Sequence, residues 1–167
     1  DYLKGDIEQI LVWAQGAVDL IKRIFFEQYD YHMSFAAIDS TMLSLIRGDG
    51  AFDIYHGGLR AKDSKGNTIF DHIDYRLYRD YIKEVVKNWS YKKFPFITSD
   101  GADDGWYRVG PLARVNNRDL FTTPLAEKER VEFAAIGDGL PVQSTLAFHW
   151  ARLIELLHCA ESIAELL

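Results

Sequence analysis

The hydrophobic positions at the two ends of the chain predict two long helices. In each segment they recur at three- and four-residue spacings, which is typical of an amphipathic helix. The first helix is expected to end near Gln28, with Asp6 as its cap, and the last to run from about Ser144 to the end. The apolar positions are Ile7, Ile10, Leu11, Ala14, Val18, Ile21, Ile24 and Phe25 in the first helix, and Leu146, Trp150, Leu153, Leu157, Ala160 and Ala164 in the last.

Between these helices, short apolar runs separated by glycine predict a small antiparallel sheet. Glycine and aspartate cluster between the runs, which is typical of hairpin turns. The simplest solution is a meander of strands over residues 52–55, 59–61 and 68–70.

Shorter helices are expected around this sheet. Helix spacing returns over residues 75–88, and Pro124 opens a helix that runs to about Gly137 with Thr123 as its cap. Residues 29–47 are ambiguous, with 31–37 as a strand or extended stretch and 39–45 as a short turn of helix. The fold class is therefore α+β and mostly helical, in a single domain over residues 1–167.

Composition and charge exclude several classes of protein. The net charge of −6 argues against a nucleic-acid binder, which usually shows a basic patch. No apolar run approaches the ~20 residues that cross a bilayer. The single cysteine, Cys159, allows no internal disulfide and is interpreted as a small core hydrophobe. We therefore expect a cytoplasmic location, with neither nucleic acid nor membrane as a partner.

Both ends of the chain resemble cut points within a longer polypeptide. The chain begins at Asp1 without an initiator methionine and enters a helix almost at once. It ends inside a helical pattern at Leu167. We interpret it as an internal segment.

No complete active site can be assembled from the residues alone. A nickel, zinc or iron–sulfur site needs several clustered soft ligands, and one cysteine with five scattered histidines does not supply them. No nucleophile motif or phosphate-binding loop is present either. We expect no catalytic, cofactor-binding or metal-ligating residue in this segment.

One charged row lies on the last helix. His149, Arg152 and Glu155 follow one another at intervals of three and are continued by His158 and Glu161. Such a row is either a solvated face with weak salt bridges or a buried polar row that supports a functional centre. Both interpretations remain open.

A pair of arginines flanks a predicted bend. Gly110-Pro111 cannot continue a strand or helix, so the chain bends there, with Arg108 and Arg114 on either side. Two guanidinium groups beside a rigid bend can clamp a carboxylate or a backbone carbonyl. The alternative is a purely structural role.

Four segments resemble nickel-iron hydrogenase large subunits of the soluble, cofactor-linked group. Residues 107–116 (YRVGPLARVN) carry the Gly-Pro-Leu-Ala-Arg motif, and residues 89–96 (WSYKKFPF) are similar to an aromatic stretch of that group. Residues 55–60 (YHGGLR), followed by Asp63 and Gly66, resemble its hairpin. The last helix, from residue 144 to 158, is similar to the helix before its C-terminal region.

The resemblance implies an activity for the parent protein rather than for this segment. The complete large, catalytic subunit binds a nickel-iron centre, Ni-Fe(CN)2CO, and oxidises hydrogen reversibly, coupled to a soluble electron carrier. Its four thiolates come from Cys-x-x-Cys motifs, neither of which is in this chain. The isolated segment is expected to be inactive and to support the helices that position the metal site. The candidate supporting residues are Arg108, Gly110, Pro111, Arg114, His149, Arg152 and Glu155.

The resemblance also implies partners. They are a small subunit that carries iron–sulfur clusters and a diaphorase or other electron-acceptor subunit. NAD, NADP, coenzyme F420 and heterodisulfide reductase all remain open as acceptors. The alternative is a redox-silent scaffold or quinone-site subunit related to the large-subunit homologue of respiratory complex I. Exposed helix faces also predict self-association of the isolated segment.

Overall fold

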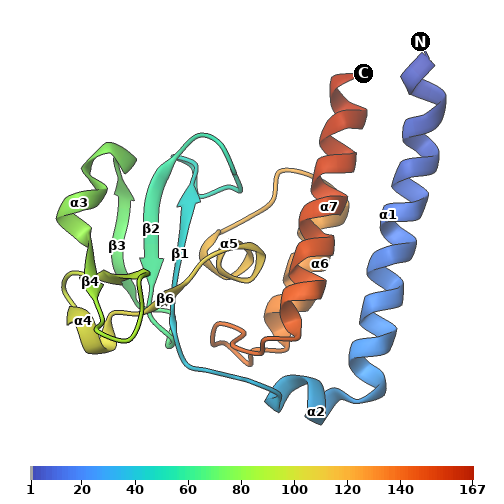
Figure 1. Cartoon of the computed structure of the whole chain (residues 1–167). Helices are drawn as coiled ribbons and strands as arrows, with labels where there is room; N and C mark the ends of the chain where they lie inside the picture. Colours follow the sequence, from blue (N-terminus) through green and yellow to red (C-terminus); the bar gives the residue numbers. More distant parts are fainter. Residues whose placement is uncertain (1) are drawn as a thin grey trace.

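The computed structural model describes the backbone of residues 2–167 and the side chains from Lys4 onward. Asp1, from which a cut end was expected, lies outside the described residues. Two long helices, α1 and α7, stand side by side at one end of the molecule, with α6 beside α7 (Figure 1). A small sheet forms the other end, and α5 lies between the sheet and the helices (Figure 1). The fold is α+β and mostly helical, as the sequence predicts.

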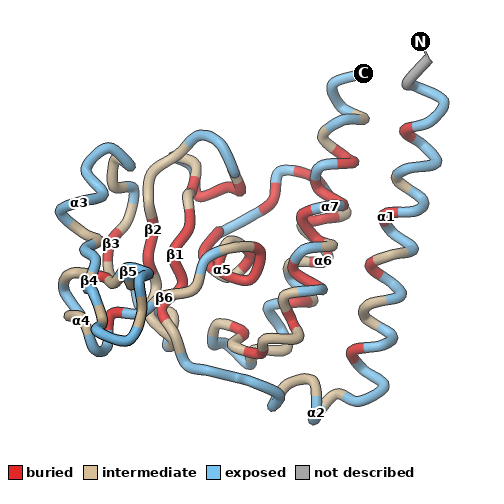
Figure 2. The backbone as a smooth tube through the Cα atoms, in the orientation of Figure 1, coloured by how far each residue is buried: buried red, intermediate tan, exposed pale blue. Residues whose placement is uncertain are grey.

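The helical end forms the larger hydrophobic core. The inner stripe of α1 packs on α7, and Trp150 and Ile154 of α7 are almost completely buried beneath it. Figure 2 shows the buried positions lining the side of α7 that faces α1, α5 and α6. The helices are α1 (Tyr2–Glu27), α2 (Tyr29–Ser34), α5 (Pro111–Asn117), α6 (Pro124–Ala135) and α7 (Ala147–Leu166).

The main sheet has four strands in the order β3-β2-β1-β6. Both pairs among β1, β2 and β3 are antiparallel, whereas β6 joins the edge of β1 in parallel. Nearly every residue of β1 is buried because α5 packs against it. The strands are β1 (Thr41–Ile46), β2 (Gly58–Lys62), β3 (Thr68–Ile73) and β6 (Tyr107–Arg108).

A separate two-stranded hairpin packs beside the sheet. Strands β4 and β5 are antiparallel, with Ile82 opposite Ile97 and Glu84 opposite Pro95. Ile97 joins Leu43, Ala61 and Phe70 in a second, smaller core. The hairpin and the short helices near it are β4 (Ile82–Val86), β5 (Lys93–Ile97), η1 (Tyr75–Leu77), α3 (Tyr78–Tyr81) and α4 (Gly101–Asp104).

Several local predictions are wrong. Residues 31–37 are expected to be extended, but 29–34 form α2, and the helical turn expected over 39–45 is strand β1. The helix expected over 75–88 is mostly strand β4. Strand β1 is a continuous apolar run buried on both faces, and hydrophobic periodicity cannot separate such a strand from a helix.

The strand expected over 52–55 is a turn. The Asp53 carboxylate accepts hydrogen bonds from the backbone N–H groups of Tyr55 and His56, at 2.7 and 2.9 Å. An aspartate that bonds its own following backbone offers the chain an alternative to a sheet ladder. Strand β1 therefore takes the third position of the meander.

Candidate functional site

The Gly110-Pro111 bend begins helix α5 and fixes its direction. Gly110 has a φ of +87°, in the left-handed region that favours glycine, and buried Pro111 occupies the first turn, where its missing N–H costs nothing. Just before the bend, the Arg108 guanidinium donates a 2.7 Å hydrogen bond to the backbone carbonyl of Gln143. Arg108 thus ties β6 to the segment that enters α7.

Arg114 of α5 and Glu155 of α7 form a two-point ion pair. Arg114 Nε lies 2.6 Å from Glu155 Oε1, and Nη2 lies 2.7 Å from Oε2. The Glu155 side chain is 11% exposed and that of Arg114 27%. A paired geometry of this kind is strong and directional, so it holds the two helices in one relative orientation.

A second arginine, Arg118, is buried next to this pair. Its guanidinium lies 3.9 Å from the ring centre of Phe52 and 4.5 Å from that of Phe121, and its Nη2 is 4.0 Å from Glu155. Burial lowers the pKa of Arg118, while the charge of Glu155 acts in the opposite direction. Its Nη1 has no hydrogen-bond partner among the described residues. Glu155 is therefore the counter-ion of both Arg114 and Arg118.

Further along α7, His158 and Glu161 contact the start of α6. The Glu161 carboxylate accepts 2.9 Å bonds from the N–H groups of Leu125 and Ala126, so it satisfies the free N–H groups at the helix start. His158 Nδ1 lies 2.8 Å from the Thr123 hydroxyl. Thr123 is at the predicted cap position, but its side chain makes no capping bond. Burial and the charge of Arg118 lower the pKa of His158.

The charged row expected on the last helix is divided by the fold. Glu155, His158 and Glu161 are buried, which agrees with the polar-row interpretation for these three. His149 and Arg152 are exposed and make no side-chain hydrogen bond or ion pair within the described part of the chain. The structure therefore brings together Arg114 and Glu155 of the candidate residues and leaves His149 and Arg152 apart.

The interpretation of Cys159 as a core residue is wrong. Its side chain is exposed, whereas Leu157, His158 and Ala160 around it are buried. Burial of the sulfur on one side and the charge of Glu155 raise the pKa of the thiol. The thiol is accessible but weakly acidic, which argues against a nucleophilic role.

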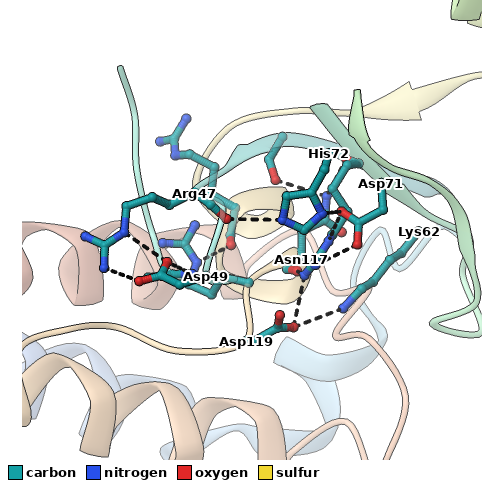
Figure 3. Close-up of polar contacts among 12 residues, drawn as sticks. Arg47, Asp49, Lys62, Asp71, His72, Asn117 and Asp119 are labelled. Atoms are coloured by element: carbon teal, nitrogen blue, oxygen red, sulfur yellow. Dashed lines mark hydrogen bonds and ion pairs between the residues drawn. The ribbon is translucent and has the colours of Figure 1, made fainter. Parts of the chain in front are cut away.

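A second ionic cluster, whose residues are not among the sequence-based candidates, joins the sheet to the end of α5 (Figure 3). Arg60 is 5% exposed, and its Nε and Nη2 donate to Asp71 at 2.7 and 2.8 Å. Its Nη1 donates to the Asn117 carbonyl at 2.9 Å and to Asp119 at 3.0 Å. Burial acts to lower the pKa of Arg60, but the hydrogen bonds to Asp71 and Asp119 outweigh it and raise that pKa.

Asn117 completes this junction from the side of α5. Its amide donates to the carbonyls of Met42 and Arg60 and to the Ser44 hydroxyl, at 3.0 to 3.1 Å. The Asn117 side chain therefore links β1 and β2 to the last residue of α5. The sequence signal that could have revealed this cluster is the similarity of residues 55–60, which ends at Arg60.

The described residues contain no group of three or more His, Cys, Asp or Glu side chains placed to hold a metal ion. Residues 2–167 also contain no helix that is both long and apolar enough to cross a membrane. The polar clusters therefore bind helices and strands to one another, and the chemistry they can perform within this chain is positioning.

Known proteins are similar to this chain in sequence. No protein-family model matches the chain. It is 36% identical over 165 residues to the NAD-reducing hydrogenase HoxS subunit beta of Cupriavidus necator, covering 96% of this chain and 33% of the relative. It is 41% identical over 156 residues to a subunit of the F420-non-reducing hydrogenase of Methanothermobacter thermautotrophicus, covering 92% and 32%. The sequence is thus similar to a segment of hydrogenase subunits.

The structural similarity is equally close. The crystal structure of an NAD+-reducing [NiFe]-hydrogenase in the H2-reduced state matches with a TM-score of 0.92 and 42% identity, over 99% of this chain and 37% of that one. The chain thus spans about a third of the length of the hydrogenase subunits that it matches.

These relatives correct one prediction. The sequence motifs predict the large, catalytic subunit, but the relatives carry the names of beta and iron–sulfur subunits. The iron–sulfur subunit is that of the F420-non-reducing hydrogenase of Archaeoglobus profundus, 35% identical over 131 residues, or 74% of this chain and 26% of the relative. The prediction of a large subunit is therefore wrong, and similarity to hydrogenase subunits of the beta or iron–sulfur type replaces it.

Proposed function

We propose that this chain is a structural segment of a hydrogenase subunit of the beta or iron–sulfur type. The supporting observation is the close match to the NAD+-reducing hydrogenase structure over 99% of the chain, at 42% identity. The parent protein would oxidise hydrogen reversibly and pass the electrons to a soluble carrier. The relatives' names include both NAD-reducing and F420-non-reducing enzymes, so the identity of the carrier is left open.

Within that protein, the segment would fix the relative positions of its helices. Arg114–Glu155 connects α5 to α7, Glu161 connects α7 to α6, and Arg60 connects the sheet to the end of α5. A metal centre requires its supporting structure to hold ligands within a few tenths of an ångström, and buried two-point ion pairs supply that rigidity. The predicted nickel-iron centre would then be held by other parts of the hydrogenase.

The test uses the full-length protein that contains this chain, purified with its partner subunits. We expect Glu155→Ala to lower hydrogen-dependent reduction of a viologen dye together with the nickel and iron content per protein. Arg152→Ala, on the exposed side of the same helix, is the matched control and should leave both unchanged. Full metal content and activity in Glu155→Ala would contradict the supporting role. Stoichiometric nickel binding by residues 1–167 alone would contradict it as well.

We also propose that an outward stripe on α1 contacts other polypeptide. Ile10, Trp13, Leu20 and Ile24 are 41–67% exposed and, with Ala17, recur at alternating intervals of three and four residues. This spacing is that of a helix-packing seam, and it lies roughly 100° around α1 from the stripe that packs on α7. In the full-length protein the seam would face other hydrogenase polypeptide, and in the isolated chain a second copy.

Light scattering of the isolated chain tests this contact. We expect a dimer at high concentration, and Trp13→Glu should convert it to a monomer. Val12→Glu, at another exposed position of α1, is the matched control and should stay dimeric. A monomer at every concentration would rule out self-association.

A further inference from the structure

The outer edge of strand β4 carries backbone groups that no described residue pairs. The Thr98 N–H donates to the Tyr81 carbonyl at 2.8 Å, and these residues are opposite each other one step beyond the Ile82–Ile97 pair. Because bonded and non-bonded pairs alternate in an antiparallel ladder, residues 83 and 85 bond to β5. The N–H and C=O groups of Glu84 and Val86 therefore point away from β5.

Proline protects the other edge of this hairpin but not the edge formed by β4. Pro95 is opposite Glu84, so its nitrogen faces the outer side of β5, where a donor is missing. In contrast, β4 contains no proline. The backbone hydrogen bonds within the described chain include none to the outward groups of Glu84 or Val86. An unprotected edge of this kind is a template for an additional strand.

A hollow of about 580 Å³ runs along this edge, between β4 and Tyr107 of β6. Arg79 and Lys83 line it, and neither lies within ion-pair distance of a carboxylate in the described part of the chain. The acidic residue of the hollow, Glu84, is paired with Lys93 at 3.3 Å. The hollow therefore has two uncompensated positive charges beside a free strand edge.

We propose that the edge of β4 binds an extended, carboxylate-rich peptide strand of a partner polypeptide, by backbone pairing at Glu84 and Val86. Arg79 and Lys83 would meet the carboxylates of that strand, which fixes its charge, while backbone pairing supplies much of the affinity. A second copy of this edge would bring the same cations together, so the charges disfavour self-pairing. This inference stands independently of the similarity to hydrogenases.

Hydrogen exchange and peptide binding test the proposal on the chain of residues 1–167. The probe is a short labelled peptide in which glutamate alternates with valine. In the free chain the amides of Lys83 and Val85 should exchange slowly and those of Glu84 and Val86 rapidly, and the peptide should protect the latter two. A matched peptide with lysine in place of glutamate should bind much more weakly, and one N-methylated at alternate residues should not bind.

Variants separate the charges from the backbone pairing. Arg79→Ala combined with Lys83→Ala should weaken binding roughly fivefold, since exposed ion pairs contribute modestly. Lys65→Ala, an exposed lysine in the β2–β3 turn, is the control and should bind normally. Equal binding of the lysine peptide, equal binding of the N-methylated peptide, or protection that misses Glu84 and Val86 would each overturn the proposal.

Discussion

The Arg114–Glu155 pair provides a sharp test because its two members differ in what their removal leaves behind. If Arg114 is replaced by alanine, Glu155 keeps Arg118 at 4.0 Å. If Glu155 is replaced, both arginines lose their carboxylate. The Arg114 side chain is 27% exposed and can turn to water, but that of Arg118 is only 2% exposed and cannot.

This asymmetry sets the expected magnitudes. Losing charged hydrogen bonds in Arg114→Ala should cost about 1.5–3 kcal/mol of unfolding free energy. Removing one partner of a buried ion pair leaves an uncompensated charge, so Glu155→Ala should cost about 3–5 kcal/mol. Adding Arg118→Met to Glu155→Ala removes the stranded cation, and the methionine packs against Phe52 and Phe121. The double variant should therefore be more stable than Glu155→Ala alone.

Urea unfolding of residues 1–167, followed by circular dichroism, measures these differences. Arg152→Ala is the surface control and is expected to stay within about 0.5 kcal/mol of the parent. Equal losses for Arg114→Ala and Glu155→Ala would refute the argument that Glu155 neutralises two arginines. A double variant less stable than Glu155→Ala would show that Arg118 is not the stranded charge.

Three further predictions concern single groups. The pKa of His158 is lowered on folding, so protonation opposes folding: unfolding free energy should fall as pH decreases from about 6.5 through the folded pKa. Urea unfolding at about pH 7.5 and 5.5 should show this loss in the parent chain and in the exposed-surface control His149→Gln, but less of it in His158→Gln. Gly50→Ala should lower the melting temperature, because φ is +83° and the added methyl would lie 2.2 Å from Asp119 Oδ2; an unchanged melting temperature would contradict this. Cys159 alkylation should be slow at neutral pH and speed up with an apparent pKa above that of a free thiol, whereas a fast reaction at pH 7 would disprove the raised pKa.

Local sequence rules succeeded where an element depends mainly on its own residues. The ends of α6 and the bend at Gly110-Pro111 follow from proline and glycine geometry, which is fixed within one or two residues. Helices α1 and α7 follow from long stretches of helical periodicity, which few strands can imitate.

The same rules failed where a partner far along the chain decided the structure. Residues 82–86 have helical spacing with the residues before them, yet they form β4 because β5 pairs with them. Two adjacent valines at 85 and 86 lower the helix preference, and the cross-strand contacts with Phe94 and Lys93 then decide. Strand β1 was missed because both its faces are buried by α5 and its neighbours.

The sequence by itself determined the fold class, the two long helices and the resemblance to hydrogenases, because periodicity and motifs are written in consecutive residues. Only the tertiary structure decided which charges are paired. Arg114 and Glu155 are 41 positions apart, and Arg60 meets a carbonyl 57 positions away. The helical repeat placed His149 and Glu155 in one row, but the packing of α5 and α6 buried Glu155 and left His149 in water. Burial and pairing depend on what covers a helix, and a helix does not encode its own neighbours.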